Sequence, residues 1–192
     1  IAILHDNSAD GAVVGGRLWP ELAAKYGYQV VVNAEFPVDT TDFGASVQQV
    51  RKSGADIVMV DTVTPQMVSI RKQLAAAGCE EIGFGDTTGM ANPLQVGEFF
   101  TAAAARLPGV ELTAHFHNTR GQGLANALAA LQAGCASFES SFGELGGCPV
   151  PKGATGNIAT EDLVSMFEEM GVSTGVDLAA LLGAARDVRD VL

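Results

Sequence analysis

The stretch GADIVMVDTVTPQMVSIRKQLAAAGCEEIGFGD, residues 54–86, carries the pattern that decides the fold. Two short apolar runs, Asp56–Val60 and Glu81–Gly85, flank a longer amphipathic stretch at 65–77. Short runs rich in β-branched residues are typical of strands buried on both faces, and a glycine such as Gly78 commonly follows the end of a helix. The stretch therefore predicts a strand–helix–strand unit with parallel strands.

The same alternation continues through the whole chain. The other predicted strands are Ile1–Leu4, Gln29–Asn33, Val110–Phe116 and Ala136–Glu139, and the other predicted helices cover 11–26, 43–53, 93–106, 121–133, 160–170 and 177–191. Thr160 is predicted to cap the helix that starts there. A sequence of alternating strands and helices belongs to one of two architectures, the closed eight-stranded barrel or the open doubly wound sheet.

Length favours the open sheet. Six units are too few to close an eight-stranded barrel, and the chain, with 192 residues, is shorter than the usual barrel of about 250. We therefore predict a single α/β domain over residues 1–192. Its fold is flavodoxin-like, a doubly wound open parallel sheet of five to six strands in the order 2-1-3-4-5, with helices on both faces. A half-barrel-like assembly completed by dimerisation is the alternative.

Composition and charge exclude several classes of partner. The chain is 47% hydrophobic and has a formal net charge of −11. Nucleic acids and anionic membranes need a basic surface, so neither is an expected partner. No apolar run approaches the roughly 18–20 residues of a membrane span, and no signal peptide is recognisable. We expect a cytoplasmic protein, monomeric or homodimeric, without a natural protein partner. Its three cysteines form no CxxC pair, which argues against a disulfide framework and a zinc knuckle.

The second part of the chain resembles hydroxymethylglutaryl-CoA lyase and related metal-dependent barrel lyases. The matching stretches are GDTTGMANP (85–93), AHFHNTRGQGLANALAALQAG (114–134), ESSFGELGGCPVPKGATGNIATEDLV (139–164) and GVDLAALL (175–182). In that family these stretches form the last three strand–helix units of a barrel and a terminal helix. The resemblance covers nearly all of residues 79–192.

The first part resembles a different family, the periplasmic receptors for branched-chain amino acids. The matching stretches are IAILHDNSADG (1–11), FPVDTTDFGASVQQVRKSGADIVMV (36–60) and RKQLAAAG (71–78). The charge also changes at this place, because residues 1–78 carry a net charge of −2 and residues 79–192 a net charge of −9. Together these features predict a chimera, natural or engineered, of a receptor lobe (1–78) and a lyase fragment (79–192).

The lyase resemblance implies a metal site. His115 and His117 are two residues apart on a predicted strand, so both project from one face. Imidazole suits Zn, Mn or Fe, and an amide oxygen shifts the preference toward Mg or Mn. By the resemblance, the two histidines and Asn157 bind a divalent cation, Asp86 lines the substrate pocket, and Cys148 takes part in proton transfer. His115 is also the candidate for the base that accepts the substrate's hydroxyl proton.

The resemblance also implies that part of the site is missing. The family's Arg-Asp pair on its first barrel strand, and a glutamate on its second, have no counterpart here. An open sheet would moreover bury His115 and His117 as ordinary polar groups. The first hypothesis is therefore a chimeric scaffold without intact enzymatic activity or a required cofactor, in which the site residues are vestigial and Mg or Mn binding is weak. Two alternatives stay open: a divalent-metal-dependent carbon–carbon lyase acting on hydroxymethylglutaryl-CoA or a related acyl-CoA, and a weak amino-acid-binding module.

Overall fold

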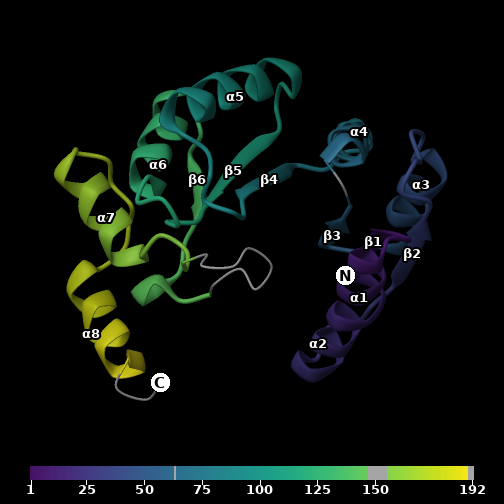
Figure 1. The fold of residues 1–192 in the computed structure, drawn as a ribbon, viewed down its shortest axis with the longest axis horizontal. Coiled ribbons are helices and arrows are strands. Elements are labelled where there is room, and N and C mark those ends of the chain that lie inside the picture. The colour runs from purple at the N-terminus through teal and green to yellow at the C-terminus, as the bar shows by residue number, and fades with distance from the viewer. Residues whose placement is uncertain (63, 147–154, 190–192) are drawn as a thin grey trace. The chain divides into compact units, whose positions relative to one another are not determined.

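The computed structural model describes residues 1–62, 64–146 and 155–189, and the chain divides into two compact units, Ile1–Glu80 (unit 1) and Glu81–Leu192 (unit 2) (Figure 1). Unit 1 contains β1 (Ala2–Asp6), α1 (Ala9–Val13), η1 (Val14–Leu18), α2 (Trp19–Tyr26), β2 (Val32–Phe36), α3 (Gly44–Ser53), β3 (Val58–Asp61) and α4 (Thr64–Ala76). Unit 2 contains β4 (Glu81–Asp86), α5 (Pro93–Arg106), β5 (Glu111–Phe116), α6 (Gly123–Gln132), β6 (Ser137–Glu139), η2 (Phe142–Glu144), α7 (Thr160–Glu169) and α8 (Leu178–Arg189). Strands and helices alternate as predicted. No helix in the described ranges is both long and apolar enough to cross a bilayer.

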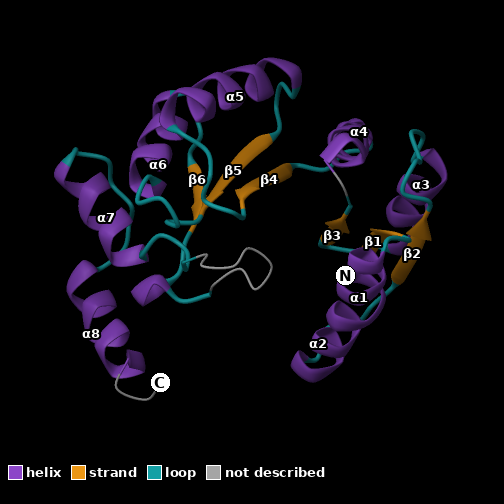
Figure 2. Ribbon diagram, viewed as in Figure 1, coloured by secondary structure: helices purple, strands orange, loops and turns teal. Residues whose placement is uncertain are grey.

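The strands pair in two parallel three-stranded sheets, β2-β1-β3 and β4-β5-β6 (Figure 2). The α/β class with parallel sheets is thereby confirmed, but the single open sheet of five to six strands is wrong for the strands that the structure describes. The predicted order fails only between β3 and β4, which are not paired in the described part of the chain, because a hydrophobic pattern identifies strands without showing where one sheet ends. Unit 1 has its first strand in the middle, as doubly wound sheets do, whereas the strands of unit 2 follow one another in chain order, as in a barrel.

The central strand of unit 1 is buried on both faces. All five residues of β1 are buried. On one face, Ala2 and Leu4 join a core with apolar residues of α3 and α4, which include Val47 and Ile70. On the other face η1 lies so close that a Cβ on Gly15 would sit 2.3 Å from the Cβ of His5. Unit 1 therefore has helices on both faces of its sheet, as a doubly wound sheet requires.

The helix predicted over 11–26 is interrupted by a π-helical turn, η1. The N–H of Trp19 donates to the carbonyl of Val14, five residues back. Pro20 follows directly, and a proline inside a helix has no N–H and clashes with the carbonyl four residues earlier. A wider turn at this place relieves that clash. The predicted helix is therefore one continuous path of three segments, α1, η1 and α2.

The core of unit 2 lies on one face of its sheet. Leu112, Ala114 and Phe116 of β5 pack with apolar residues of α5, α6 and α7. Helices α5 and α6 lie side by side over this face (Figure 1). The alternate residues Thr113 and His115 therefore project from the opposite face, where they contact Glu81 and Glu139, respectively. These four residues, Glu81, Thr113, His115 and Glu139, are called the polar face of unit 2 below.

Helix α7 begins as predicted, but its cap differs. The residue before the first turn is Ala159, so Thr160 is already helical and is not the N-cap that the sequence predicted. The hydroxyl of Thr160 instead accepts a hydrogen bond from the hydroxyl of Ser140 at 2.9 Å. Glu161 and Asp162 in the first turn still stabilise this end of the helix, because its unpaired N–H groups carry partial positive charge.

Candidate functional site

Polar side chains of unit 2 gather where β5 and β6 end. His115 is the last residue but one of β5, His117 follows the strand, and Glu139 ends β6. A segment distant in sequence joins them, because His117 and Asn157 form an antiparallel bridge. The N–H of Ile158 also donates to the carbonyl of Phe116 at 3.1 Å. The carboxyl end of a parallel sheet is where α/β proteins place their ligands, so this edge is the candidate site.

The two histidine rings lie close together. Their centroids are 5.2 Å apart and their planes are tilted by 59°. His117 is buried, at 7% exposure, whereas the side chain of His115 is 27% exposed. The expectation that a spacing of two residues brings the rings to one side is confirmed. The open-sheet prediction allowed both histidines to be fully buried. His117 is buried, whereas His115 still reaches solvent.

Several neighbours act on His115. Burial lowers the pKa of its imidazole from the ordinary value of 6.5, because the charged form loses hydration. Glu139 opposes this effect and raises the pKa, and its Oε2 lies 3.4 Å from Nδ1 of the ring. His117 lowers the pKa further, while a side-chain hydrogen bond with Asn157 and the charge of Asp86 raise it. The net result favours a neutral ring, which is the form that can bind a metal or accept a proton.

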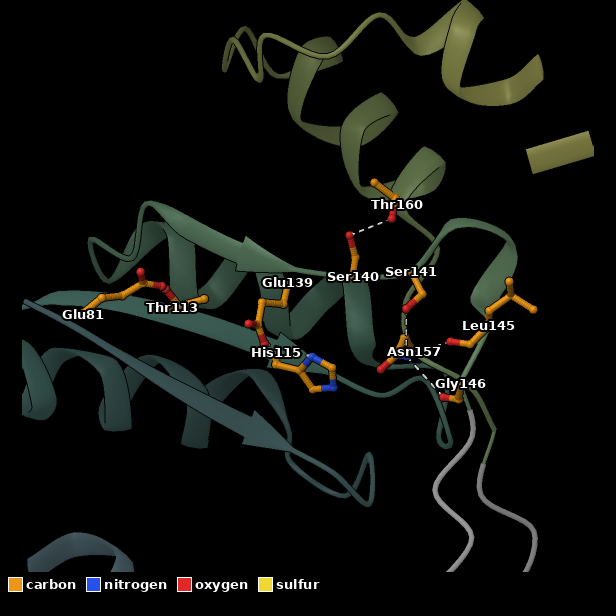
Figure 3. A network of polar contacts seen from close by, with 10 residues as sticks. All are labelled: Glu81, Thr113, His115, Glu139, Ser140, Ser141, Leu145, Gly146, Asn157 and Thr160. Atoms are coloured by element: carbon orange, nitrogen blue, oxygen red, sulfur yellow. Dashed lines mark hydrogen bonds and ion pairs between the residues drawn. The ribbon is translucent and has the colours of Figure 1, made fainter. Parts of the chain in front are cut away.

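The amide of Asn157 has a fixed orientation. Its Nδ2 donates to Oγ of Ser141 at 3.0 Å, to the carbonyl of Leu145 at 2.7 Å and to the carbonyl of Gly146 at 3.2 Å (Figure 3). These acceptors require the nitrogen on that side, so the side-chain oxygen is turned to the side where His115 lies (Figure 3). This Oδ1 is buried and has no partner at normal hydrogen-bond geometry among the described residues. A buried amide oxygen in that state costs free energy that a bound cation or donor would recover.

These residues fit a divalent cation. Nδ1 of His117 lies 3.3 Å from the carbonyl of Thr155, so its hydrogen-bonding partner leaves Nε2 available. Nδ1 of His115 lies beside Glu139, and Oδ1 of Asn157 has no partner at normal hydrogen-bond geometry among the described residues. Two imidazole nitrogens and one amide oxygen form a donor set that suits Mn or Mg. Among the described residues no group of three or more His, Cys, Asp and Glu is placed to hold a metal, so a cation here depends on the Asn157 oxygen.

The other predicted site residues are placed differently. Asp86 ends β4, and its two oxygens accept hydrogen bonds from the N–H groups of Met90 and Ala91 at 3.1 and 3.0 Å. Its carboxylate therefore shapes the turn before α5, and its role toward a substrate stays a prediction. Cys148, the predicted group for proton transfer, lies outside the described residues.

Sequence reasoning missed Glu139 and Ser141. Both stood in a stretch that was matched to the lyases, but neither was given a role. Glu139 is paired with His115 in the register of β5 and β6, and Ser141 accepts from Asn157. A signal for Glu139 was present in the sequence. It is the last residue of the predicted strand that follows the strand with His115, and adjacent parallel strands end at the same edge of a sheet.

Comparison with known proteins relates the chain to one family of lyases. Residues 29–188 match the model of the HMGL-like family. The hydroxymethylglutaryl-CoA lyase of Bacillus subtilis is 44% identical over 130 residues, which are 68% of this chain and 44% of that protein. The (R)-citramalyl-CoA lyase of Chloroflexus aurantiacus is 48% identical over 124 residues, 64% of this chain and 39% of that protein. The chain thus spans less than half the length of these relatives.

Solved structures lead to the same family. An HMG-CoA lyase of Acinetobacter baumannii, in complex with coenzyme A and 3-methylmalate, has a TM-score of 0.66 at 36% identity and covers 76% of this chain and 52% of its own. An HMG-CoA lyase of Brucella melitensis has a TM-score of 0.63 at 31% identity and covers 100% of this chain and 66% of its own. The family match begins inside the predicted receptor lobe and runs across the predicted junction. These matches support the lyase part of the prediction and give no support to a receptor lobe or a chimera.

Proposed function

Because the chain belongs to the HMGL-like family, we propose that it acts in a divalent-metal-dependent lyase that cleaves a carbon–carbon bond of hydroxymethylglutaryl-CoA or a related acyl-CoA. The sequence leaves this lyase function open as an alternative, and the family match favours it over an inactive scaffold. One observation carries it: His115, His117 and Asn157 lie together. In each histidine Nδ1 faces a protein oxygen and Nε2 is available, and the amide of Asn157 is oriented so that Oδ1 is available.

The reaction of this class needs a proton to leave and another to arrive. The substrate's hydroxyl loses its proton, the bond between the hydroxyl-bearing carbon and the carbon next to the thioester breaks, and the acyl-CoA enolate takes up a proton. A bound divalent cation supplies Lewis acidity toward the substrate's oxygens. The available lone pair of His115 serves one role at a time, so we assign it to the cation, and the hydroxyl proton would then pass to a water molecule at the site. Cys148 is proposed, by resemblance alone, as the acid for the enolate.

The neutral state of His115 supports this assignment. A histidine binds a metal only through an unprotonated nitrogen, and burial lowers the pKa of this ring. Asn157 contributes through the fixed orientation of its amide, which keeps an oxygen and not a nitrogen turned toward the ring. With such a cation, His115, His117 and Asn157 would supply two imidazole nitrogens and one neutral oxygen, and the substrate's own oxygens would be further ligands.

A scaffold without intact activity is the second candidate, and the strand order of unit 1 is the observation that favours it over an intact barrel. The order β2-β1-β3 in unit 1 is that of a doubly wound sheet, whereas a barrel would have β2 in the middle. The amino-acid-binding alternative has no such observation in its favour among the described residues and stays a prediction.

A direct assay separates the two candidates. The purified chain is incubated with Mn²⁺ or Mg²⁺ and either hydroxymethylglutaryl-CoA or citramalyl-CoA, and the release of acetyl-CoA is followed. Metal-dependent turnover that is lost in a His115→Ala/His117→Ala variant supports the lyase. Absence of turnover with both substrates, in a protein that folds and binds Mn²⁺, favours the scaffold.

A further inference from the structure

Glu139 lies beside one edge of the His115 ring. The register of the sheet sets Gly85, His115 and Glu139 side by side on β4, β5 and β6. Oε2 of Glu139 lies 3.4 Å from Nδ1 of His115, and the two residues share the polar face of unit 2 (Figure 3). Gly85 lies next to the carbon side of the ring, because a Cβ built on it would be 3.6 Å from Cδ2 of His115. Glycine has no side chain that could accept a hydrogen bond there. Of the two ring nitrogens, Nδ1 is therefore the one held near a carboxylate.

The contact between Glu139 and Nδ1 influences which nitrogen of His115 carries the hydrogen. A neutral imidazole carries one N–H, and a nearby acceptor decides which nitrogen bears it. The separation of 3.4 Å is longer than an ordinary N–H···O hydrogen bond of about 2.7–3.2 Å, and such contacts commonly tighten when a ligand binds. A carboxylate at this edge favours the hydrogen on Nδ1 and leaves the lone pair on Nε2.

His117 has the same arrangement with a different acceptor. Its Nδ1 lies 3.3 Å from the carbonyl of Thr155, which also favours the hydrogen on Nδ1. Both rings therefore direct their lone pairs from Nε2. For His117 the acceptor is a backbone carbonyl, which no substitution at that position removes. For His115 it is a side chain that is 64% exposed and open to substitution.

We propose that Glu139 is a positioning residue that holds His115 in its Nδ1–H form, so that Nε2 is the atom offered to a ligand. The ligand meant here is the cation of the proposed function, and that part of the inference rests on the proposed function. The tautomer itself does not, because it is a property of the metal-free protein. Carboxylates in this position next to a metal-binding histidine fix the ring and raise its affinity for the metal.

The test reads the tautomer directly. Long-range ¹H–¹⁵N correlation spectra of the metal-free chain, at a pH where the imidazoles are neutral, distinguish Nδ1–H from Nε2–H rings. The His115 signals are assigned by their loss in His115→Ala. We expect the wild type to contain the Nδ1–H form of His115 and the Glu139→Ala variant to shift toward Nε2–H, while His117 is unchanged. Glu98→Ala removes another exposed carboxylate, on α5, and is the matched control that leaves the tautomer alone.

A second measurement concerns the metal. The affinity for Mn²⁺, measured by electron paramagnetic resonance of the free ion, is expected to fall by about tenfold or more in Glu139→Ala and to stay unchanged in Glu98→Ala. A His115 tautomer that depends on Glu139 supports the positioning role even in a chain without lyase activity. A wild-type ring in the Nε2–H form, or a ring unaffected by Glu139→Ala, overturns it even in an active lyase.

Discussion

Replacing Gly123 by alanine tests the packing that brings Asn157 to the site. Gly123 begins α6, and a Cβ there would lie 2.2 Å from Cγ2 of Ile158 and 3.2 Å from Oδ1 of Asn118. Ile158 is 1% exposed, so it has no solvent to move into. Its Cγ2 belongs to a β-branched side chain, whose first torsion is stiff. The added methyl group therefore forces a shift of the segment that contains Asn157.

The cost follows from the overlap. Non-bonded carbon atoms pack at about 3.5–4.0 Å, so Ile158 has to withdraw by more than about 1 Å. Overpacking a filled core typically costs about 1–3 kcal/mol, and an overlap of this size places the cost at about 3 kcal/mol. Alanine in a helix returns about 0.5–1 kcal/mol relative to glycine. We expect a net loss of about 2 kcal/mol in the free energy of unfolding.

Gly97→Ala is the matched control. Gly97 lies inside α5, and a Cβ there would have no neighbour within 4 Å among the described residues. That variant is expected to gain about 0.5–1 kcal/mol. Urea unfolding followed by circular dichroism measures both changes, at an unchanged dependence on urea. If Gly123→Ala unfolds at the wild-type urea concentration or above it, Ile158 does not pack against α6, and the reasoning that places Asn157 beside His115 fails.

Three further predictions concern single groups. Asn157→Asp replaces an amide nitrogen that donates to three acceptors by a carboxylate oxygen. Urea unfolding should show a loss of about 2 kcal/mol in the free energy of unfolding. A change of less than about 0.5 kcal/mol, as for a surface substitution, would contradict the orientation of the amide. Burial, and then the charges of Asp10 and Asp6, raise the pKa of Asp61 from 3.8. The folded chain thus holds this proton more tightly than the unfolded chain, and stability falls as pH rises from 3.8 through the raised value. Asp61→Asn should therefore unfold at higher urea than the wild type at neutral pH, with the difference disappearing in acid. Burial lowers the pKa of His115, so the unfolded chain binds more protons than the folded chain just below pH 6.5. Stability should therefore fall as the pH decreases through that value. The urea midpoint, measured as a function of pH, should show this fall in the wild type and not in His115→Ala.

Local sequence signals predicted the elements and most of the strand neighbours, but they did not predict that the sheet ends at β3 and a second one begins at β4. The apolar run at Glu81–Gly85 and the amphipathic stretch at 93–106 became β4 and α5 almost residue for residue. Strand β2 begins at Val32 and not at Gln29, because strand ends depend on pairing with β1 and not on hydrophobicity alone. The order β2-β1-β3 was predicted within a larger sheet, but nothing in a residue pattern says where one sheet ends and another begins.

The site was predictable where spacing determines geometry. Two histidines separated by one residue on a strand had to share a side, and their rings lie 5.2 Å apart. The role of Asn157 could be predicted only from the family resemblance. It lies forty positions after His117 in the sequence, and only the folded chain brings the two residues into a bridge. The fixed amide orientation and the contact with Glu139 depend on side-chain packing across three segments, which no spacing rule describes.

The most direct test of the cation site is thermal unfolding of the chain in increasing Mn²⁺, with His115→Ala/His117→Ala as the comparison. A ligand that binds only the folded state raises the unfolding midpoint, by an amount that corresponds to about 2.7 kcal/mol at one hundred times its dissociation constant. We predict a saturable rise in the wild type that disappears in the double variant. No rise, or an equal rise in both proteins, would contradict a cation site built from these residues.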